Sequence, residues 1–154
     1  MADERIRPAT EEDVEAVLPL MREYCRFYEV EAPNDAGLAE MARALIAADD
    51  SDGILLVGCD GDGEVVGFAA CGWKWSSLRG ARVVVLEDLF VNPASRGGGI
   101  GRALIDACAD RARALGAPII EWLTQPGNAR ARSVYDATGA EAETLIEYAI
   151  ELRP

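Results

Sequence analysis

The stretch "LEDLFVNPASRGGGIGRAL", residues 86–104, places three consecutive glycines, and a fourth two positions later, directly before a segment with helical spacing. Ile100, Ala103 and Leu104 mark the apolar face of that predicted helix. Glycine is a poor helix former, so these glycines need a purpose other than starting a helix. Glycines leave backbone N–H groups uncovered, and at a helix N-terminus such groups bind a phosphate or pyrophosphate.

Two known phosphate-binding motifs do not fit the stretch. A Walker loop requires Lys and then Ser or Thr after its last glycine, but here Arg102 and Ala103 follow. A dinucleotide fingerprint requires a third glycine or an alanine, but that position holds Arg102 or Leu104, depending on the starting glycine. The pattern that residues 96–101 do satisfy is R-x-x-G-x-G.

The chain has 154 residues, half of them apolar, which is enough for one sizeable core and too short for two ordinary domains. We therefore expect a single domain, residues 1–154. No apolar run approaches the length of a membrane span, and residues 1–13 lack the apolar core of a signal peptide. These features favour a cytoplasmic protein without a membrane partner.

Cysteine and histidine usage argues against metal chemistry. Cys25, Cys59, Cys71 and Cys108 lie far apart without a CxxC pair, and histidine is absent. Each cysteine lies among apolar residues, so we expect reduced thiols in the core rather than a metal site. The lack of histidine also excludes a histidine base.

The net charge of −12 is concentrated in the first part of the chain. Residues 1–64 hold 17 acids and 5 bases, whereas residues 65–154 hold 10 of each. Because phosphate backbones require a basic face, nucleic acid is not expected as a partner. The acidic part is either a solvated surface or a region that attracts cationic substrates.

The pattern of apolar residues and turns predicts a mixed α/β sheet in one domain. The predicted order is a strand at 5–8, a helix from a Thr10 and Asp13 capping box to about Tyr28, a helix after Asn34, strands at 54–60, 64–75 and 82–91, a helix from 100 to about 115, a strand at 119–124, a helix at 128–138 and a last strand at 144–152.

With these motifs in place, the sequence resembles the GNAT superfamily of acyl-CoA-dependent N-acetyltransferases. The resemblance rests on the strand and glycine run of residues 86–104 and on the Asn-x-x-Ala-x-x-x-Tyr pattern of Asn128, Ala131 and Tyr135. It is particularly close to the diamine (polyamine) acetyltransferase branch, which has a similar IRPAT start. It implies a single-domain α/β fold with a mostly antiparallel sheet, splayed at the acetyl-CoA site, and helices on both faces.

The resemblance also implies that acetyl-CoA is the co-substrate. The glycine loop would hold the CoA pyrophosphate, the strand before it would bind the pantetheine arm, and Asn128 would reach toward CoA. The implied CoA-binding residues are Leu89, Phe90, Val91, Arg96, Gly97, Gly98, Gly99, Ile100, Gly101, Arg102, Asn128 and Ala131. Residues 89–135 carry six arginines and three acids, which suits a polyanionic ligand.

Acetyl transfer requires a neutral amine, so a group must accept the proton of an ammonium whose pKa is about 10.4. Glu87 and Asp88 lie in an otherwise apolar strand. Strand alternation predicts Glu87 on the face of Leu89 and Val91, and Asp88 on the opposite face. The resemblance implies that Glu87 is the base, whereas Asp88 is either structural or binds substrate.

The same resemblance implies that Tyr135 protonates the departing CoA thiolate and that the amine attacks the thioester directly, with no acyl-enzyme. Tyr28 and Glu29, together with Trp73 and Trp75 on one hairpin face, suit a small cationic primary amine. The tryptophans are equally compatible with a core or a dimer interface. By analogy with the family we expect a homodimer.

Two alternatives are also compatible with the sequence. One is a catalytically silent CoA-binding or regulatory module on the same fold, against which the presence of both Glu87 and Tyr135 argues. The other is a nucleotide-binding oxidoreductase, against which the missing third glycine argues.

Overall fold

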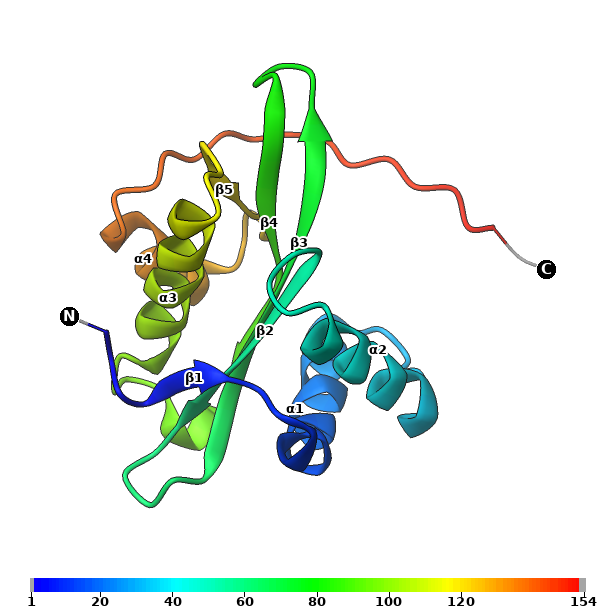
Figure 1. Ribbon diagram of the computed structural model, residues 1–154, viewed down its shortest axis with the longest axis vertical. Coiled ribbons are helices and arrows are strands. Elements are labelled where there is room, and N and C mark those ends of the chain that lie inside the picture. The colour runs from blue at the N-terminus through cyan, green and yellow to red at the C-terminus, as the bar shows by residue number, and fades with distance from the viewer. Residues whose placement is uncertain (1, 153–154) are drawn as a thin grey trace. The chain divides into compact units, whose positions relative to one another are not determined.

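The computed structural model describes residues 2–152 (Figure 1). Along the chain it has β1 (Ile6–Pro8), the 3-10 turn η1 (Glu11–Asp13), α1 (Val14–Phe27), α2 (Asp35–Ala47), β2 (Gly53–Cys59), β3 (Val65–Ser76), β4 (Ala81–Val91), the 3-10 turn η2 (Pro93–Ser95), α3 (Ile100–Ala114), β5 (Ile120–Glu121) and α4 (Ala129–Ala137). These elements form two compact units, one up to Leu123 and the other from Thr124 onward.

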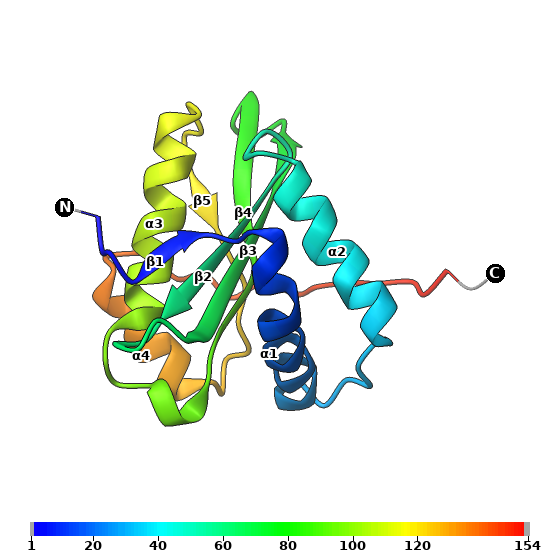
Figure 2. The same cartoon turned by 60° about the horizontal axis from the view of Figure 1, so that its bottom comes forward.

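The first unit contains a five-stranded sheet in the order β1-β2-β3-β4-β5. All pairs are antiparallel except β4 and β5, which are parallel and are connected through α3. Helices α1 and α2 cover one face of the sheet and α3 covers the other (Figure 2). The predicted α/β class and mostly antiparallel sheet are therefore confirmed.

Close contact between β2 and the start of α3 fixes the position of the helix end that follows the glycine loop. The first helical residue, Ile100, is 5% exposed. A β-carbon added to Gly58 of β2 would lie 2.6 Å from Cγ2 of Ile100, so only glycine leaves room for the helix there. The end of α3 that carries the glycines is thus packed directly on the sheet.

The predicted capping box is confirmed at the start of η1, the 3-10 turn that leads into α1, and it includes a partner that the sequence did not indicate. Asp13 accepts a hydrogen bond of 2.8 Å from the backbone N–H of Thr10. Its carboxylate is also bound by both terminal nitrogens of Arg7 in β1, at 2.7 and 2.8 Å. The Arg7 guanidinium, more than the Thr10 contact, holds the pKa of Asp13 below its usual range. This pair ties β1 to the helix that follows.

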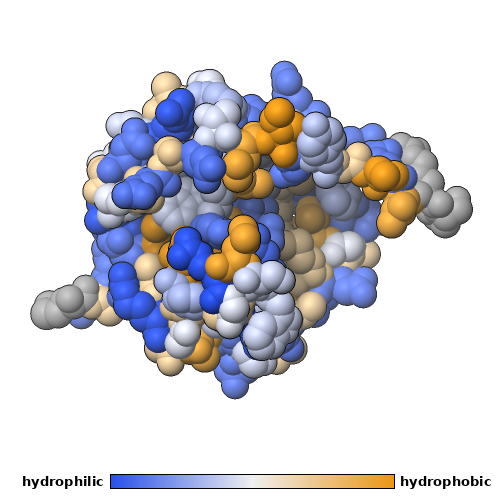
Figure 3. Space-filling view, turned by 90° about the horizontal axis from the view of Figure 1, so that it is seen from above, coloured by the Kyte–Doolittle hydropathy of each residue, from blue (hydrophilic) through white to orange (hydrophobic). Residues whose placement is uncertain are grey.

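Two sequence predictions for strands are wrong in extent or in kind. The strand predicted at 119–124 is reduced to the two residues of β5. Residues 144–152, predicted as a last strand, have no regular secondary structure, and their large apolar side chains are exposed. Figure 3 shows exposed hydrophobic residues, in orange, scattered among the hydrophilic residues, in blue, that cover much of this face of the molecule. An alternating apolar pattern predicts a strand only when a neighbouring strand accepts its hydrogen bonds, and the pattern itself does not identify that neighbour.

Within residues 2–152, no helix is long and apolar enough to cross a membrane. The four cysteines are free thiols, as expected; Cys59, Cys71 and Cys108 are buried, and Cys25 is half-buried.

Candidate active site

The glycine loop has a backbone conformation that requires glycine. Gly97 and Gly99 have φ angles of +89° and +82°, a region that residues with a side chain rarely adopt. Gly99 is the N-cap of α3, and its carbonyl accepts the first intrahelical hydrogen bond, from Ala103, at 2.9 Å. The N–H groups of the first helical turn, including those of Ile100 and Gly101, have no carbonyl partner within the helix. Together with the positive end of the helix dipole, they form an anion-binding end.

Side chains on both flanks anchor this loop. The Nε of Arg96 donates to the carbonyl oxygen of Val91 at 2.9 Å, and the guanidinium lies 5.4 Å from the ring centre of Phe90. Nη1 of Arg5 donates to the carbonyl oxygen of Gly98 at 2.8 Å. The loop is therefore held to the end of β4 on one flank and to the residue before β1 on the other.

The arginine excess of residues 89–135 is partly neutralised within the molecule. Arg102 is bound to Asp106 one helical turn later, at 3.0 Å, and Arg113 to Asp110 at 2.6 Å. Arg111 is bound to Asp50. Anion attraction at this site must therefore depend more on the backbone amides than the count of arginines predicts.

Strands β4 and β5 separate soon after they pair. In the described part of the chain, β5 pairs only with Val84 and Val85 of β4. The rest of β4, up to Val91, continues along β3 alone. The edge of β4 from Leu86 onward therefore presents backbone groups that are not used by β5, as the expected splayed sheet requires.

A β-bulge in β4 changes the predicted arrangement of the two acids. Ala70 pairs with Asp88 and the next residue, Cys71, pairs with Leu86, so Glu87 is the extra residue of a β-bulge in β4. A β-carbon on Gly72, which shares a face with Ala70, would lie 3.9 Å from Oε1 of Glu87. Both carboxylates therefore lie on the sheet face covered by α1, and the prediction that Glu87 shares the face of Leu89 and Val91 is wrong.

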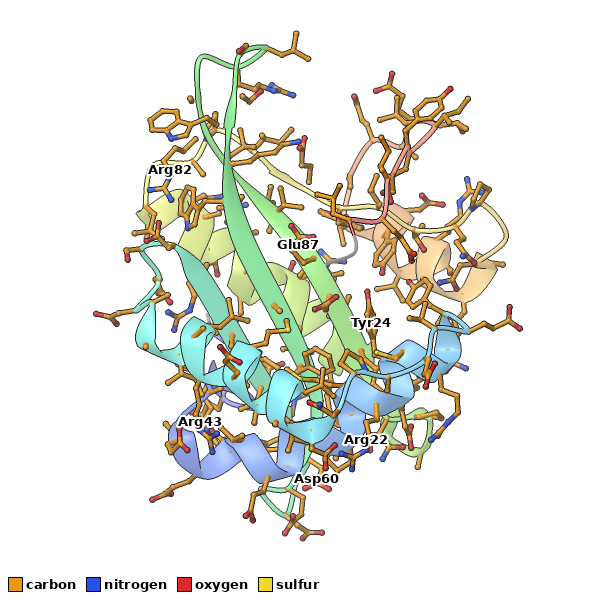
Figure 4. All side chains as sticks on the ribbon, turned by 90° about the vertical axis from the view of Figure 1, so that its right-hand side faces the viewer. Arg22, Tyr24, Arg43, Asp60, Arg82 and Glu87 are labelled. Carbon is orange, nitrogen blue, oxygen red and sulfur yellow. The ribbon has the colours of Figure 1, made fainter. Side chains whose placement is uncertain are left out.

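Tyr24 of α1 is a site residue that the sequence reasoning missed. Its hydroxyl donates to the backbone carbonyl oxygen of Glu87 at 3.3 Å, and Figure 4 shows both residues on the α1 side of the sheet. Asp88 is half-buried, and burial raises the pKa of its carboxyl group, an effect that the nearby Tyr24 hydroxyl partly offsets. The available signal was spacing, because Tyr24 comes three residues after Met21 on the apolar stripe of the helix.

Aromatic rings surround Tyr24. The ring centres of Tyr24 and Tyr28 are 5.0 Å apart, and Phe90 of β4 lies 6.4 Å from Tyr24 in an edge-on arrangement. Tyr28 caps the end of α1, and Glu29 follows it, exposed, with a φ angle of +57°. Of the predicted acceptor residues, Tyr28 thus shares an aromatic cluster with the residues around the two acids.

The two predicted tryptophans differ in their surroundings. Trp73 donates its indole N–H to the carbonyl oxygen of Asp50 at 3.2 Å, and the Arg82 guanidinium lies 4.6 Å above its ring. Trp75 is 79% exposed. Trp73 therefore has a structural role in joining β3 and β4 to the turn after α2, whereas Trp75 is available to a ligand or partner.

The remaining predicted residues lie in the second unit. Asn128 is the N-cap of α4, as expected, and its side-chain oxygen accepts from the N–H of Ala131 at 3.3 Å. Its side-chain amide donates to the Thr124 hydroxyl at 3.3 Å. Tyr135 is half-buried on the same helix, and its carbonyl oxygen accepts from the Thr138 hydroxyl at 2.6 Å.

Comparison with known proteins identifies the family. The model of the acetyltransferase (GNAT) family matches residues 15–140. This chain belongs to the GNAT family. As a GNAT protein it is an acyltransferase, in agreement with relatives that are named N-acetyltransferases.

Two relatives illustrate the range of the family around this chain. The uncharacterized N-acetyltransferase YhfO of Bacillus subtilis is 31% identical over 96% of this chain and 97% of its own length. The D-amino-acid N-acetyltransferase HPA3 of Saccharomyces cerevisiae is 29% identical over 87% of this chain and 83% of its own.

Solved structures confirm the GNAT fold. The aminoglycoside N-acetyltransferase AAC(6')-Iy, determined in complex with CoA, has a TM-score of 0.80 at 24% identity, covering 96% of this chain and 94% of that one. Among residues 2–152 of this GNAT chain, no cluster of three or more histidine, cysteine, aspartate or glutamate residues is arranged to hold a metal ion.

The two middle glycines of the loop provide a matched test of its backbone. Gly99→Ala forces a side chain into a left-handed conformation and should lower the free energy of unfolding by about 1 kcal/mol. Gly98→Ala is the control, because Gly98 does not have a positive φ and its nearest neighbour would be 3.9 Å away. Chemical denaturation measures both variants. Equal losses of stability in the two would contradict the backbone argument.

Proposed function

We propose that this GNAT acyltransferase uses acetyl-CoA to acetylate a primary amine of a small cationic molecule in a ternary complex. The observation that carries the proposal is the glycine loop, whose left-handed backbone at Gly97 and Gly99 leads into the N-terminus of α3, where the first N–H groups have no partner within the helix. A catalytically silent module would not need Glu87 and Asp88 gathered on one face beside Tyr24.

On the CoA side, we assign the pyrophosphate to the amides of Gly97 to Arg102. The pantetheine arm would lie along the edge of β4 at Leu89 to Val91, where β5 has already separated from it. Strand-like backbone groups there can bind the amides of the arm in the same way as a further strand would. Asn128, the N-cap of α4, and Ala131 in that helix are proposed as further CoA contacts.

On the amine side, we propose Glu87 as the base, acting directly or through water, and Asp88 as a substrate-binding acid. The carboxylate first accepts a proton from the substrate ammonium, and the neutral amine nitrogen then attacks the thioester carbonyl carbon and loses its second proton to water. The carbon–sulfur bond then breaks, and the CoA sulfur leaves with the electron pair of that bond. We assign to the Tyr135 hydroxyl the proton that converts this thiolate to the thiol.

Acidic and aromatic residues favour a cationic acceptor. Residues 1–64 hold 17 acids and 5 bases. This excess of negative charge lowers the electrostatic cost of bringing an ammonium to the site. Tyr28 and Glu29 at the end of α1 are the proposed contacts, whereas Trp75 lies seven residues along β3 from the Phe68 ring beside Tyr24, too far to share a small ligand with them. A diamine fits these residues. Amino acids and aminoglycosides, which appear in the names of two of the similar proteins above, are the other candidate classes. We further propose that the enzyme is a cytoplasmic homodimer.

A thiol-release assay with acetyl-CoA over diamines, amino acids and aminoglycosides tests the function. We expect turnover with at least one class of primary amine, and no turnover when a tertiary amine replaces it. Fluorescence titration should show binding of acetyl-CoA and not of NAD(H). Background rates with every amine, despite acetyl-CoA binding, would support the silent module instead.

The base is tested with Glu87→Gln. The variant should lose at least tenfold in rate at neutral pH, where the amine is protonated, and recover as the pH rises toward about 10 and more of the amine is neutral. Asp88→Asn is the matched control: it removes a carboxylate from the same face, and we expect it to raise the KM for the amine without this recovery. A pH-independent loss in Glu87→Gln would assign Glu87 a structural role.

The proton donor is tested with Tyr135→Phe, which removes only a hydroxyl. We expect kcat to fall by about a hundredfold, in the range typical of general acids, while the dissociation constant of acetyl-CoA stays within twofold. Steady-state kinetics and calorimetry measure the two quantities. Unchanged turnover would remove Tyr135 from this role.

A further inference from the structure

Arg5, the residue immediately before β1, contacts the glycine loop across a sequence separation of 93 residues. Its Nη1 donates to the carbonyl oxygen of Gly98 at 2.8 Å. A β-carbon added to Gly99 would lie 3.8 Å from Nη2 of the same guanidinium. The planar group therefore lies against the peptide between Gly98 and Gly99.

Asp3 and the sheet fix the position of this guanidinium. The two carboxylate oxygens of Asp3 accept from Nε and Nη2 of Arg5 at 3.0 and 2.8 Å, and Oδ1 also accepts from the Arg5 backbone N–H at 3.0 Å. The Arg5 carbonyl oxygen accepts from Cys59 of β2 at 2.8 Å. Backbone and side chain are thus both restrained before the guanidinium reaches the loop.

The geometry of a trans peptide gives this contact a consequence for the loop. In such a unit the carbonyl and the following N–H point in opposite directions. Because the oxygen of Gly98 is held by Arg5, the N–H of Gly99 must point to the side away from Arg5. A peptide between two glycines turns easily when it is not held, since neither residue has a β-carbon to restrict it.

The ion pair itself has little value for stability. The side chains of Arg5 and Asp3 are 39% and 33% exposed, and solvent screens exposed ion pairs of this kind, so they add little to the free energy of unfolding. The hydrogen bonds from Arg5 to Asp3 hold the pKa of the Asp3 carboxyl group at about 2, so the carboxylate stays charged across the physiological range.

We infer that Arg5, oriented by Asp3, is a positioning residue that holds the Gly98–Gly99 peptide so that its N–H faces the CoA pyrophosphate. The inference rests on the proposed function, which assigns the pyrophosphate to this loop. Arg5 acts through the backbone of the loop rather than as a charge that attracts the phosphates.

Titration calorimetry of the full chain with CoA, and with pantetheine as the same arm without phosphates, tests the inference. Arg5→Ala should weaken CoA binding by about tenfold and pantetheine binding by less than twofold. Asp3→Ala should also weaken CoA binding, by about threefold, although it removes a negative charge near the polyanion. A purely electrostatic role predicts the opposite sign, tighter CoA binding in Asp3→Ala.

Two controls separate positioning from folding. Arg43→Ala removes an arginine from another exposed ion pair, with Glu11 at 2.7 Å, and should leave CoA affinity unchanged. The melting temperatures of Arg5→Ala and Asp3→Ala should stay within about 3 °C of the wild type.

The possible failures are distinguishable. Wild-type binding of CoA that is no tighter than binding of pantetheine would refute the pyrophosphate assignment in the proposed function. Tight CoA binding by the wild type that persists in Arg5→Ala, or that improves in Asp3→Ala, would overturn the positioning role alone.

Discussion

The chain must pass from β4 into α3 with its backbone amides uncovered, and this requirement governs the rest of the site. Glycine at positions 97 and 99 supplies the left-handed conformations that the turn needs. Gly58 in β2 lets the first turn of α3 pack on the sheet, and Arg96 binds the glycine loop to the end of β4. Elements far apart in the sequence thus serve one short stretch of backbone.

The predictions that rested on short local sequence patterns were the most reliable. The glycine loop, the capping box at Thr10 and the cap at Asn128 depend on a few neighbouring residues, and each forms as predicted. Most helices and strands also follow from their periodicity, because burial of one face determines them. The strand predicted at residues 144–152 does not form. The segment carries an apolar pattern, but strand pairing depends on a partner that lies outside the segment.

The features that shape the site depend on contacts between distant segments, and no local pattern reveals them. Arg5 meets Gly98 across 93 positions. Tyr24 reaches the backbone of Glu87 from a helix near the start of the chain. The candidate acids were identified from the sequence because charged residues are costly in an apolar strand. Their common face was not, because the alternation rule assumes a regular strand and does not reveal the extra residue of a β-bulge.

Because of the bulge at Glu87, the chemistry of β4 depends on the number of residues in the strand as well as on their identity. If one residue were deleted there, regular alternation would return and the two carboxylates would be divided between opposite sides of the sheet. Insertions and deletions in β4 are therefore a separate route by which relatives of this chain can gain or lose an acidic pair, even when both acids are retained in the sequence.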